Sequence, residues 1–208
     1  MPEGIESEPL SAETVFGDRL DLARSFTHEL VRRGEELGLI GPLEPPRIWT
    51  RHVINCGLMS PLLRPGRVAD VGSGAGLPGL VLAIARPDVQ MVLIEPMERR
   101  VDWLRAESSR LGLDNVEVVR SRAEDVQSRS VDQLTARAVS ALKTLIPLTE
   151  PLVRHGGELL YMKGHRVDAE VAAAAAVIRN SGLTHVEVLV LGEGITSELT
   201  RIFRATVA

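Results

Sequence analysis

The sequence predicts an α/β fold, in which a seven-stranded, mostly parallel sheet with its last strand antiparallel follows an N-terminal helical segment. Short apolar strands alternate with helical stretches from residue 67 onward, an order typical of a parallel sheet covered on both faces. The last two strands are separated by a glycine-containing turn of about seven residues, which is too short for a helix and predicts an antiparallel hairpin. The 208 residues are enough to bury a core without a disulfide or a metal.

The N-terminal part of the chain is predicted to be a tail followed by two helices. Residues 1–10 are acidic, and we expect them to be disordered. Apolar residues recur every three to four positions between Phe16 and Leu37, which predicts an amphipathic helix over about 12–37 that Ser11 can cap and Gly38 can end. A proline-containing linker precedes a second expected helix over about 47–59. We therefore divide the chain into a tail (1–10), a helical segment (11–65) and a sheet domain (66–208).

The sheet domain is expected to alternate between strands and helical stretches. The strands are expected at 67–71, 89–95, 116–120, 131–137, 157–162, 184–191 and 199–206. The helical stretches are expected at 78–86, 98–112, 141–154 and 167–181, with a short turn near 124–128. The carboxyl ends of the parallel strands then meet at one edge of the sheet, where open α/β sheets bind their ligands.

The composition is that of an ordinary globular protein, with 44% apolar and 25% charged residues. No apolar stretch approaches the roughly 20 residues that span a bilayer, and the acidic start lacks an apolar signal segment, so we expect no membrane anchor and no leader. The one cysteine, Cys56, excludes an internal disulfide and fits a reducing, cytoplasmic compartment. The histidines and Cys56 show no metal-ligand spacing, so we expect no metal.

The distribution of charge qualifies what the total implies about partners. A formal net charge of −4 argues weakly against a nucleic-acid partner. Acids predominate within residues 1–30, however, whereas residues 31–67 carry six arginines and three glutamates. Guanidinium groups pair well with phosphates, although a solvated helix face is the more common explanation for such residues. We therefore expect local rather than broad contact with phosphate.

A glycine-rich loop after the first sheet strand carries the strongest functional signal. Residues 68–79 read Val-Ala-Asp-Val-Gly-Ser-Gly-Ala-Gly-Leu-Pro-Gly, so a strand runs directly into a loop whose glycines permit a sharp turn and expose bare backbone to a ligand. The loop satisfies both the dinucleotide pattern G-x-G-x-x-G and the pattern D-x-G-x-G-x-G of S-adenosylmethionine (AdoMet) sites. The acid Asp70 suits the cationic AdoMet better than a pyrophosphate. A tight turn without a ligand is the structural alternative.

Further candidate residues stand at the ends of the next predicted strands. Glu95 can accept two hydrogen bonds from the ribose hydroxyls of either NAD or AdoMet. Ala123 and Glu124 follow the third strand, Arg137 ends the fourth beside the expected cleft, and Lys163 ends the fifth. Ordinary alternatives are a solvated strand-end Glu or Lys, acids that stabilise a helix N-terminus, and a surface ion pair for Arg137.

These motifs resemble the signature of the small-subunit ribosomal RNA guanine-N7 methyltransferases (RsmG, also called GidB). The Gly-Leu-Pro-Gly ending of the loop is the most specific element. Four further stretches fit the family: Trp49–His52, Arg99–Leu104, Thr135–Val139 and Met162–Gly164. The resemblance covers about residues 14–206. The chain departs from the family at Glu95-Pro96, where Asp and Ser are usual, and in a loose version of the tail at Arg201–Arg204.

The resemblance implies a class I AdoMet-dependent methyltransferase with a Rossmann-like sheet. Its implied acceptor is N7 of a guanine (guanine 527 in the usual numbering) in the 16S rRNA of the small ribosomal subunit, and we expect a monomer with no membrane partner. S-adenosyl-L-methionine is implied to contact Asp70, Gly72, Ser73, Gly74, Gly76, Leu77, Glu95, Ala123, Glu124 and Arg137. Arg137 and Lys163 are implied as catalytic positioning residues, and Arg47, Arg51, His52, Lys163 and Arg201 as RNA-binding residues.

The chemistry of the implied acceptor predicts a mechanism without a general base. Guanine N7 carries a free lone pair and can attack the methyl group directly, so we expect catalysis to consist mainly of positioning. Three alternatives stay open at this point: an NAD-dependent oxidoreductase, a non-catalytic AdoMet- or RNA-binding module, and a methyltransferase for a small molecule. The oxidoreductase is disfavoured because Tyr161 is the only tyrosine and no second catalytic domain follows.

Overall fold

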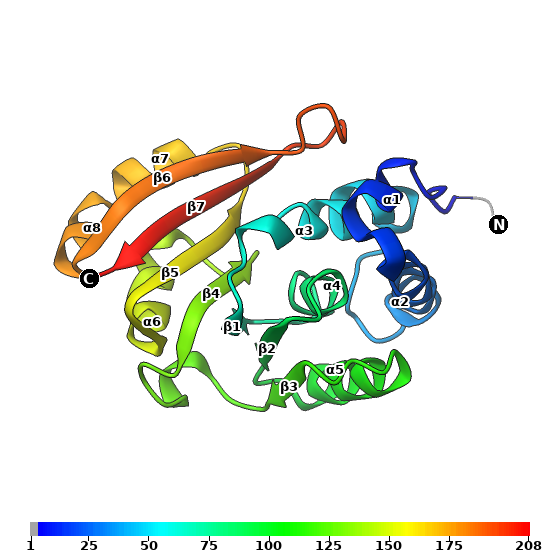
Figure 1. Cartoon of the computed structure of the whole chain (residues 1–208), viewed down its shortest axis with the longest axis horizontal. Coiled ribbons are helices and arrows are strands. Elements are labelled where there is room, and N and C mark those ends of the chain that lie inside the picture. Colours follow the sequence, from blue (N-terminus) through cyan, green and yellow to red (C-terminus); the bar gives the residue numbers. More distant parts are fainter. Residues whose placement is uncertain (1–3) are drawn as a thin grey trace.

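The computed structural model describes residues 4–208, which form one seven-stranded sheet flanked by helices (Figure 1). The strands are β1 (Gly66–Val71), β2 (Val89–Ile94), β3 (Val116–Val119), β4 (Val131–Arg137), β5 (Val153–Lys163), β6 (Leu183–Leu191) and β7 (Thr200–Val207). Their order in the sheet is β3-β2-β1-β4-β5-β7-β6. The pairings among β1 to β5 are parallel, and β7 lies antiparallel between β5 and β6. The predicted fold class is therefore confirmed, including the antiparallel final hairpin.

Helices cover both faces of this sheet (Figure 1). The N-terminal helices, α4 (Gly79–Ala85) and α5 (Glu98–Arg110) pack on one face, whereas α6 (Leu142–Thr149), α7 (Val167–Ala173) and α8 (Ala175–Asn180) pack on the other. Successive strand residues point to opposite faces, so Val68 joins the first core and Ala69 the second. Both cores are apolar, and together they hold the strand ends in fixed positions.

Two of the predicted helical stretches are shorter or divided in the structure. The stretch at 141–154 ends with α6 and a short turn η6 (Glu150–Leu152), because β5 starts at Val153, earlier than expected, and pairs there with Val131. The stretch at 167–181 is divided into α7 and α8 at Ala174. The short turn expected near 124–128 is present as η5 (Ala123–Asp125).

The N-terminal helices are also more broken than predicted. In place of one helix over 12–37 there are α1 (Ser11–Phe16), a turn η1 (Gly17–Arg19) and α2 (Leu20–Arg33), because Gly17 adopts a positive φ of 48° that no α-helix contains. The second expected helix consists of η2 (Pro45–Arg47), a π-helical segment η3 (Ile48–Ile54) and α3 (Asn55–Gly57), followed by a turn η4 (Ser60–Leu62).

The start of the chain differs from the disordered tail that we expected over residues 1–10. The Glu6 carboxylate accepts hydrogen bonds from the backbone N–H groups of Trp49 (2.8 Å) and Thr50 (3.0 Å), and Glu8 pairs with Arg24 at 2.6 Å. These acids hold residues 6–8 against the helical segment, which their charge alone did not predict. Residues 1–3 of the expected tail lie outside the described residues.

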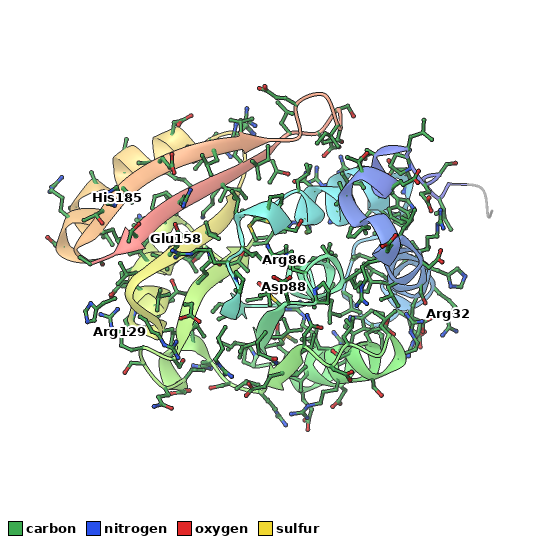
Figure 2. All side chains as sticks on the ribbon, viewed as in Figure 1. Arg32, Arg86, Asp88, Arg129, Glu158 and His185 are labelled. Carbon is green, nitrogen blue, oxygen red and sulfur yellow. The ribbon has the colours of Figure 1, made fainter. Side chains whose placement is uncertain are left out.

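The helical segment is joined to the sheet domain through a shared core and through Arg86. Phe26 and Trp49 belong to the same apolar cluster as α4 and α5. The Arg86 guanidinium donates to the backbone oxygens of Ser60 (2.8 Å) and Leu63 (2.6 Å), and it pairs with Asp88 next to it (Figure 2). Within the described residues, no helix is both long and apolar enough to span a membrane.

Candidate functional site

The glycine loop follows β1 at the point where the strand order of the sheet reverses. β1 lies between β2 and β4, so the chain leaves β1 toward one side of the sheet and later crosses to the other. Ligands of open α/β sheets bind outside such a point. Gly72, Gly74 and Gly76 have φ values of 72°, 53° and 89°, which side-chain-bearing residues rarely adopt. A Cβ at Gly72 would also approach the Val139 side chain to 2.9 Å, so the loop depends on bare backbone.

Asp70 lies beneath this loop and is fully buried. Its Oδ2 accepts a hydrogen bond from the Gly79 N–H at 3.0 Å, which fixes the start of α4 to the end of β1. Within residues 4–208, its Oδ1 has no hydrogen-bond partner. Burial raises the pKa of Asp70 to about 7, while the Gly79 hydrogen bond opposes the shift. A buried acid with an unused oxygen fits a cationic group bound against the loop, although Asp70 itself does not line the cavity above it.

Glu95 fixes the loop from the end of β2. Its Oε2 accepts a hydrogen bond from the Gly74 N–H at 3.0 Å and its Oε1 accepts one from the Met97 N–H at 3.0 Å, and the side chain is 2% exposed. Arg100 approaches the same carboxylate at 3.9 Å. Each carboxylate oxygen has a second lone pair, so Glu95 retains the capacity to accept ribose hydroxyls. That contact stays a prediction.

A cavity of about 310 Å³ opens above the glycine loop, and we refer to it as the loop cavity. One wall is the glycine loop, with Gly72, Ser73, Gly74, Ala75 and Leu77. The opposite wall is the N-terminal segment, with Leu39, Ile40, Gly41, Glu44 and His52. Arg100 of α5 and Arg137 and Ala138 at the end of β4 complete the cavity. Bare backbone, an apolar wall and carboxylates beside the loop fit a nucleoside ligand that carries a cationic amino-acid end. The residues present therefore fit AdoMet, the cofactor that the resemblance implies.

Five of the predicted cofactor residues do not line the loop cavity: Asp70 and Glu95, which hold the loop from beneath, and Gly76, Ala123 and Glu124. Gly76 has its N–H bonded to the Ser73 carbonyl at 2.7 Å and shapes the loop. Ala123 is 8% exposed and Glu124 is exposed, and both lie in η5 after β3, the strand beyond Glu95. Their contacts with an adenine ring stay predictions.

Arg137 extends from the end of β4 into a network with the N-terminal segment. Its Nη2 lies 2.9 Å from His52 Nδ1 and 3.2 Å from the Arg51 carbonyl, and its Nη1 lies 3.2 Å from Cys56 Sγ. A guanidinium group only donates hydrogen bonds, so His52 Nδ1 must accept. The ring proton of neutral His52 is therefore on Nε2, which donates to Glu44 Oε2 at 2.6 Å. Glu44, His52 and Arg137 form a directed chain of hydrogen bonds.

The electrostatics of this chain favour neutral His52 and ionised Glu44. Burial lowers the pKa of His52 below its ordinary value of 6.5, and the charge of Arg137 lowers it further. Burial raises the pKa of Glu44, but the hydrogen bond from His52 and the nearby Arg51 and Arg47 outweigh it and hold that pKa below its usual value. Burial also raises the pKa of the Cys56 thiol, so Cys56 contacts Arg137 as a thiol.

A second cavity, of about 510 Å³, lies at the ends of β4 and β5, and we refer to it as the strand-end cavity. Arg137 and Ala138 line both cavities, so they form the wall between them. Lys163 also lines the strand-end cavity, but its Nζ already donates to the Ser140 carbonyl (2.7 Å) and to Glu170 Oε2 (2.9 Å). Its side chain is 9% exposed, so Lys163 holds the cavity wall in place more than it offers a free charge.

The predicted RNA-binding residues are only partly brought together. Arg51 lines the strand-end cavity, and Arg47 and Arg51 both approach Glu44, at 3.7 and 3.4 Å, with 43% of each side chain exposed. His52 is 9% exposed and holds Arg137, so it is placed to act through that residue. Arg201 pairs with Lys163 in the β5–β7 register but does not line either cavity. Their contacts with RNA stay predictions.

The sequence reasoning missed Glu44, Cys56 and Glu170, which hold the predicted cations. The one signal for Glu44 was its position as an acid within the arginine-rich stretch 31–67. A larger, mostly apolar cavity of about 690 Å³ lies elsewhere, between Ile5–Glu8 and α2, and none of the predicted site residues lines it. No cluster of three or more metal-ligating side chains occurs within the part of the chain that the structure describes.

Comparison with known proteins gives one consistent result. The family model described as "rRNA small subunit methyltransferase G" (GidB) matches residues 19–200. The ribosomal RNA small subunit methyltransferase G of Clavibacter michiganensis is 63% identical over 211 residues, and that of Leifsonia xyli is 59% identical over 208 residues, each alignment covering 100% of both chains.

Solved structures share the fold at much lower identity. A SAM-dependent methyltransferase from Aquifex aeolicus has a TM-score of 0.57 at 19% identity, covering 79% of this chain and 94% of the other. A mutant 16S rRNA (adenine(1408)-N(1))-methyltransferase from Catenulisporales acidiphilia, solved with its cosubstrate SAM, has a TM-score of 0.53 at 16% identity, covering 72% and 88%. At such identities the likeness concerns the fold alone.

Proposed function

The chain belongs to the family of rRNA small subunit methyltransferases G, and from this premise we propose that it transfers a methyl group from AdoMet to N7 of a guanine in the 16S rRNA of the small subunit. The observation that carries this proposal is the pair of cavities at the carboxyl edge of the sheet, which share Arg137 and Ala138 as their wall. One cavity fits the cofactor, and the other opens next to it for an acceptor. Arg137 is the residue placed at their junction.

The chemistry needs positioning more than proton transfer. AdoMet, when bound, supplies a methyl group activated by the positive sulfur to which it is attached. With AdoMet bound, the N7 lone pair would form the new N–C bond as the C–S bond broke and its electron pair stayed on sulfur. The positive charge would pass from sulfur to the base, so no proton would move and no general base would be required. The task of this chain is to align nitrogen, carbon and sulfur. Asp70 and Glu95 serve that task because they fix the glycine loop through Gly79 and Gly74.

Arg137 is proposed as the catalytic positioning residue. Its guanidinium is held by His52 and Cys56 at the wall between the cavities, from where it can donate to guanine O6 or to a phosphate. Arg47 and Arg51, each with 43% of its side chain exposed, are proposed to contact RNA phosphates at the rim. We further propose that the protein acts as a monomer in the cytoplasm.

The experiment is methyl transfer from tritiated AdoMet to small subunits isolated from cells that lack this protein, followed by mass mapping of the 16S rRNA. We expect one N7-methylguanosine to appear with the wild type and to fall at least tenfold with Arg137→Ala. The matched control is Arg154→Ala, because Arg154 is half-exposed and pairs with Asp132 near the opposite end of the strands. Transfer by Arg137→Ala at the wild-type rate would remove Arg137 from the site, and absence of the modified guanine with the wild type would refute the function.

A further inference from the structure

The loop between β6 and β7 brings an additional wall to the strand-end cavity. β7 is antiparallel to β5, so its first residues lie at the same edge of the sheet as the last residues of β4 and β5: Arg137 pairs with Met162, and Met162 with Ile202. β7 is two strands away from β4, a separation of roughly 10 Å. The first residue of β7 and the residues just before it therefore face the cavity from a different side than Arg137 does, and Glu198, Leu199 and Thr200 line it.

Three of the five charged side chains that line the cavity are cationic, and only one of its two carboxylates is already paired. Arg51, Arg137 and Lys163 contribute cationic donors, and the carboxylate of Glu170 is already paired with Lys163 at 2.9 Å. Glu198 is half-buried, and within residues 4–208 its carboxylate takes part in no hydrogen bond or ion pair. Its backbone N–H donates to Thr196 Oγ1 at 3.3 Å, and Thr200 Oγ1 donates to the Asn55 carbonyl at 3.2 Å, so this wall is attached to α3. Glu198 thus offers the cavity an unpaired carboxylate on a wall that is held in place.

We propose that the strand-end cavity receives the target guanine and that the Glu198 carboxylate accepts hydrogen bonds from its N1–H and N2 amino group. This inference rests on the proposed function. An ionised carboxylate only accepts hydrogen bonds and can take two parallel donors, which is the pattern of the Watson–Crick edge of guanine. The N7 and O6 acceptors lie on a different edge of the base, which leaves them free to face the donors of Arg137 and the wall shared with the loop cavity.

The same arrangement explains how adenine would be rejected. Adenine presents an unprotonated N1 at the position where guanine presents N1–H, so it would place an acceptor against the Glu198 carboxylate. A site whose polar groups are left unpaired by the wrong substrate discriminates much more strongly than an apolar pocket does. A volume of about 510 Å³ is within the range of ligand pockets, roughly 300–1,000 Å³, and enzymes that modify a base take it out of its stack into such a pocket.

The test combines a change in the protein with a change in the base. Small subunits are reconstituted with 16S rRNA that carries either guanine or inosine at the target position, because inosine lacks only the N2 amino group. The proteins are the wild type, Glu198→Gln and the control Glu193→Gln, which makes the same change of charge at an exposed residue of the same loop. AdoMet affinity is measured for all three, and we expect it to be equal because Glu198 does not line the loop cavity.

We expect the wild type and Glu193→Gln to prefer guanine over inosine by about tenfold or more in kcat/KM, as loss of a hydrogen bond to a charged group implies. Glu198→Gln should lose at least tenfold on guanine and show little preference between the two bases. Equal rates of the wild type on guanine and inosine would overturn the proposal, and so would an unchanged preference in Glu198→Gln. If the wild type methylates neither the guanine-containing nor the inosine-containing small subunits, the proposed function itself fails, and this result is distinguishable from the other two.

Discussion

His52 offers the sharpest test of how the site is organised, because it holds Arg137 through one nitrogen and Glu44 through the other. His52→Ala removes the acceptor that lies 2.9 Å from Arg137 Nη2. A hydrogen bond to a charged group contributes roughly 1.5–3 kcal/mol, and about 1.4 kcal/mol corresponds to a factor of ten. The contacts of Arg137 with the Arg51 carbonyl and Cys56, both at 3.2 Å, remain. Because these contacts still hold the guanidinium, we expect the effect to lie at the lower end of that energy range, which is a fall of about 10- to 30-fold in kcat/KM.

The dependence on pH distinguishes this role from a loss of packing. Burial and Arg137 lower the pKa of His52 below 6.5, so the ring is neutral at pH 7. Protonation at Nδ1 would direct an N–H at the Arg137 guanidinium and break the contact. Because the folded-state pKa is lower than the unfolded one, the stability that neutral His52 contributes is complete above pH 6.5 and is lost as the pH falls through the folded value. Activity should follow the same direction.

The assay is the pH profile of kcat/KM for methyl transfer between pH 5 and 8. The wild type should lose activity on the acid side below pH 6.5, whereas His52→Gln, which keeps one acceptor and one donor but cannot titrate, should keep most activity and lose that acid limb. The control is His28→Gln, which changes an exposed histidine of α2 and should behave as the wild type does. An acid limb that is identical in the wild type and in His52→Gln would refute the assigned chain from Glu44 to Arg137.

Three further predictions concern the residues that hold the loop and the sheet. Burial raises the pKa of Asp70 to about 7, so the stability that this group contributes is complete below about pH 4 and is lost as the pH rises through 7. Asp70→Asn should reduce the difference between the free energies of unfolding measured in urea at pH 5 and at pH 7.5. An unchanged difference would contradict the pKa assigned to Asp70. A Cβ at Gly79 would clash with the side chains of Leu93 and Asp70, so Gly79→Ala should lower the free energy of unfolding by about 1–3 kcal/mol. The control is Gly164→Ala, which should leave the free energy of unfolding unchanged because a Cβ at Gly164 meets open space. Glu158 lies on β5 (Figure 2) and is buried, and its carboxylate accepts hydrogen bonds from Arg204 and Gln133. Glu158→Gln should lower the free energy of unfolding by roughly 1–3 kcal/mol without changing AdoMet affinity, which calorimetry can check.

Much of the fold could be predicted because local patterns determine it. The alternation of strands and helices gives the parallel sheet, and the short turn after residue 191 gives the antiparallel hairpin. The position of β7 between β5 and β6 could not be predicted, since a hairpin pattern does not say which of its two strands pairs with the rest of the sheet. The ordered contacts of Glu6 could not be predicted either, because they join residues more than 40 positions apart.

In the candidate site too, the features defined by neighbouring residues could be predicted from the sequence, and the contacts between distant residues could not. The glycine loop and the strand-end position of Arg137 are visible in the sequence, because each is defined by its own strand. The partners of Arg137 come from the N-terminal segment, 85 positions away for His52 and 81 for Cys56. No local spacing indicates such a pair, and a lone histidine near arginines is more often a solvated surface residue.

The partners of the cations also change what the charge distribution implies about RNA. Glu44 approaches Arg47, Arg51 and His52, and Glu170 pairs with Lys163, so acids of the same region neutralise much of the positive charge around the two cavities. Each phosphate contact must then compete with an existing ion pair, which weakens the electrostatic part of RNA binding and its dependence on salt. If the target base enters the strand-end cavity as we propose, selection of the substrate depends more on the fit of that single base than on a basic surface. This explains how a chain with a net charge of −4 can act on RNA.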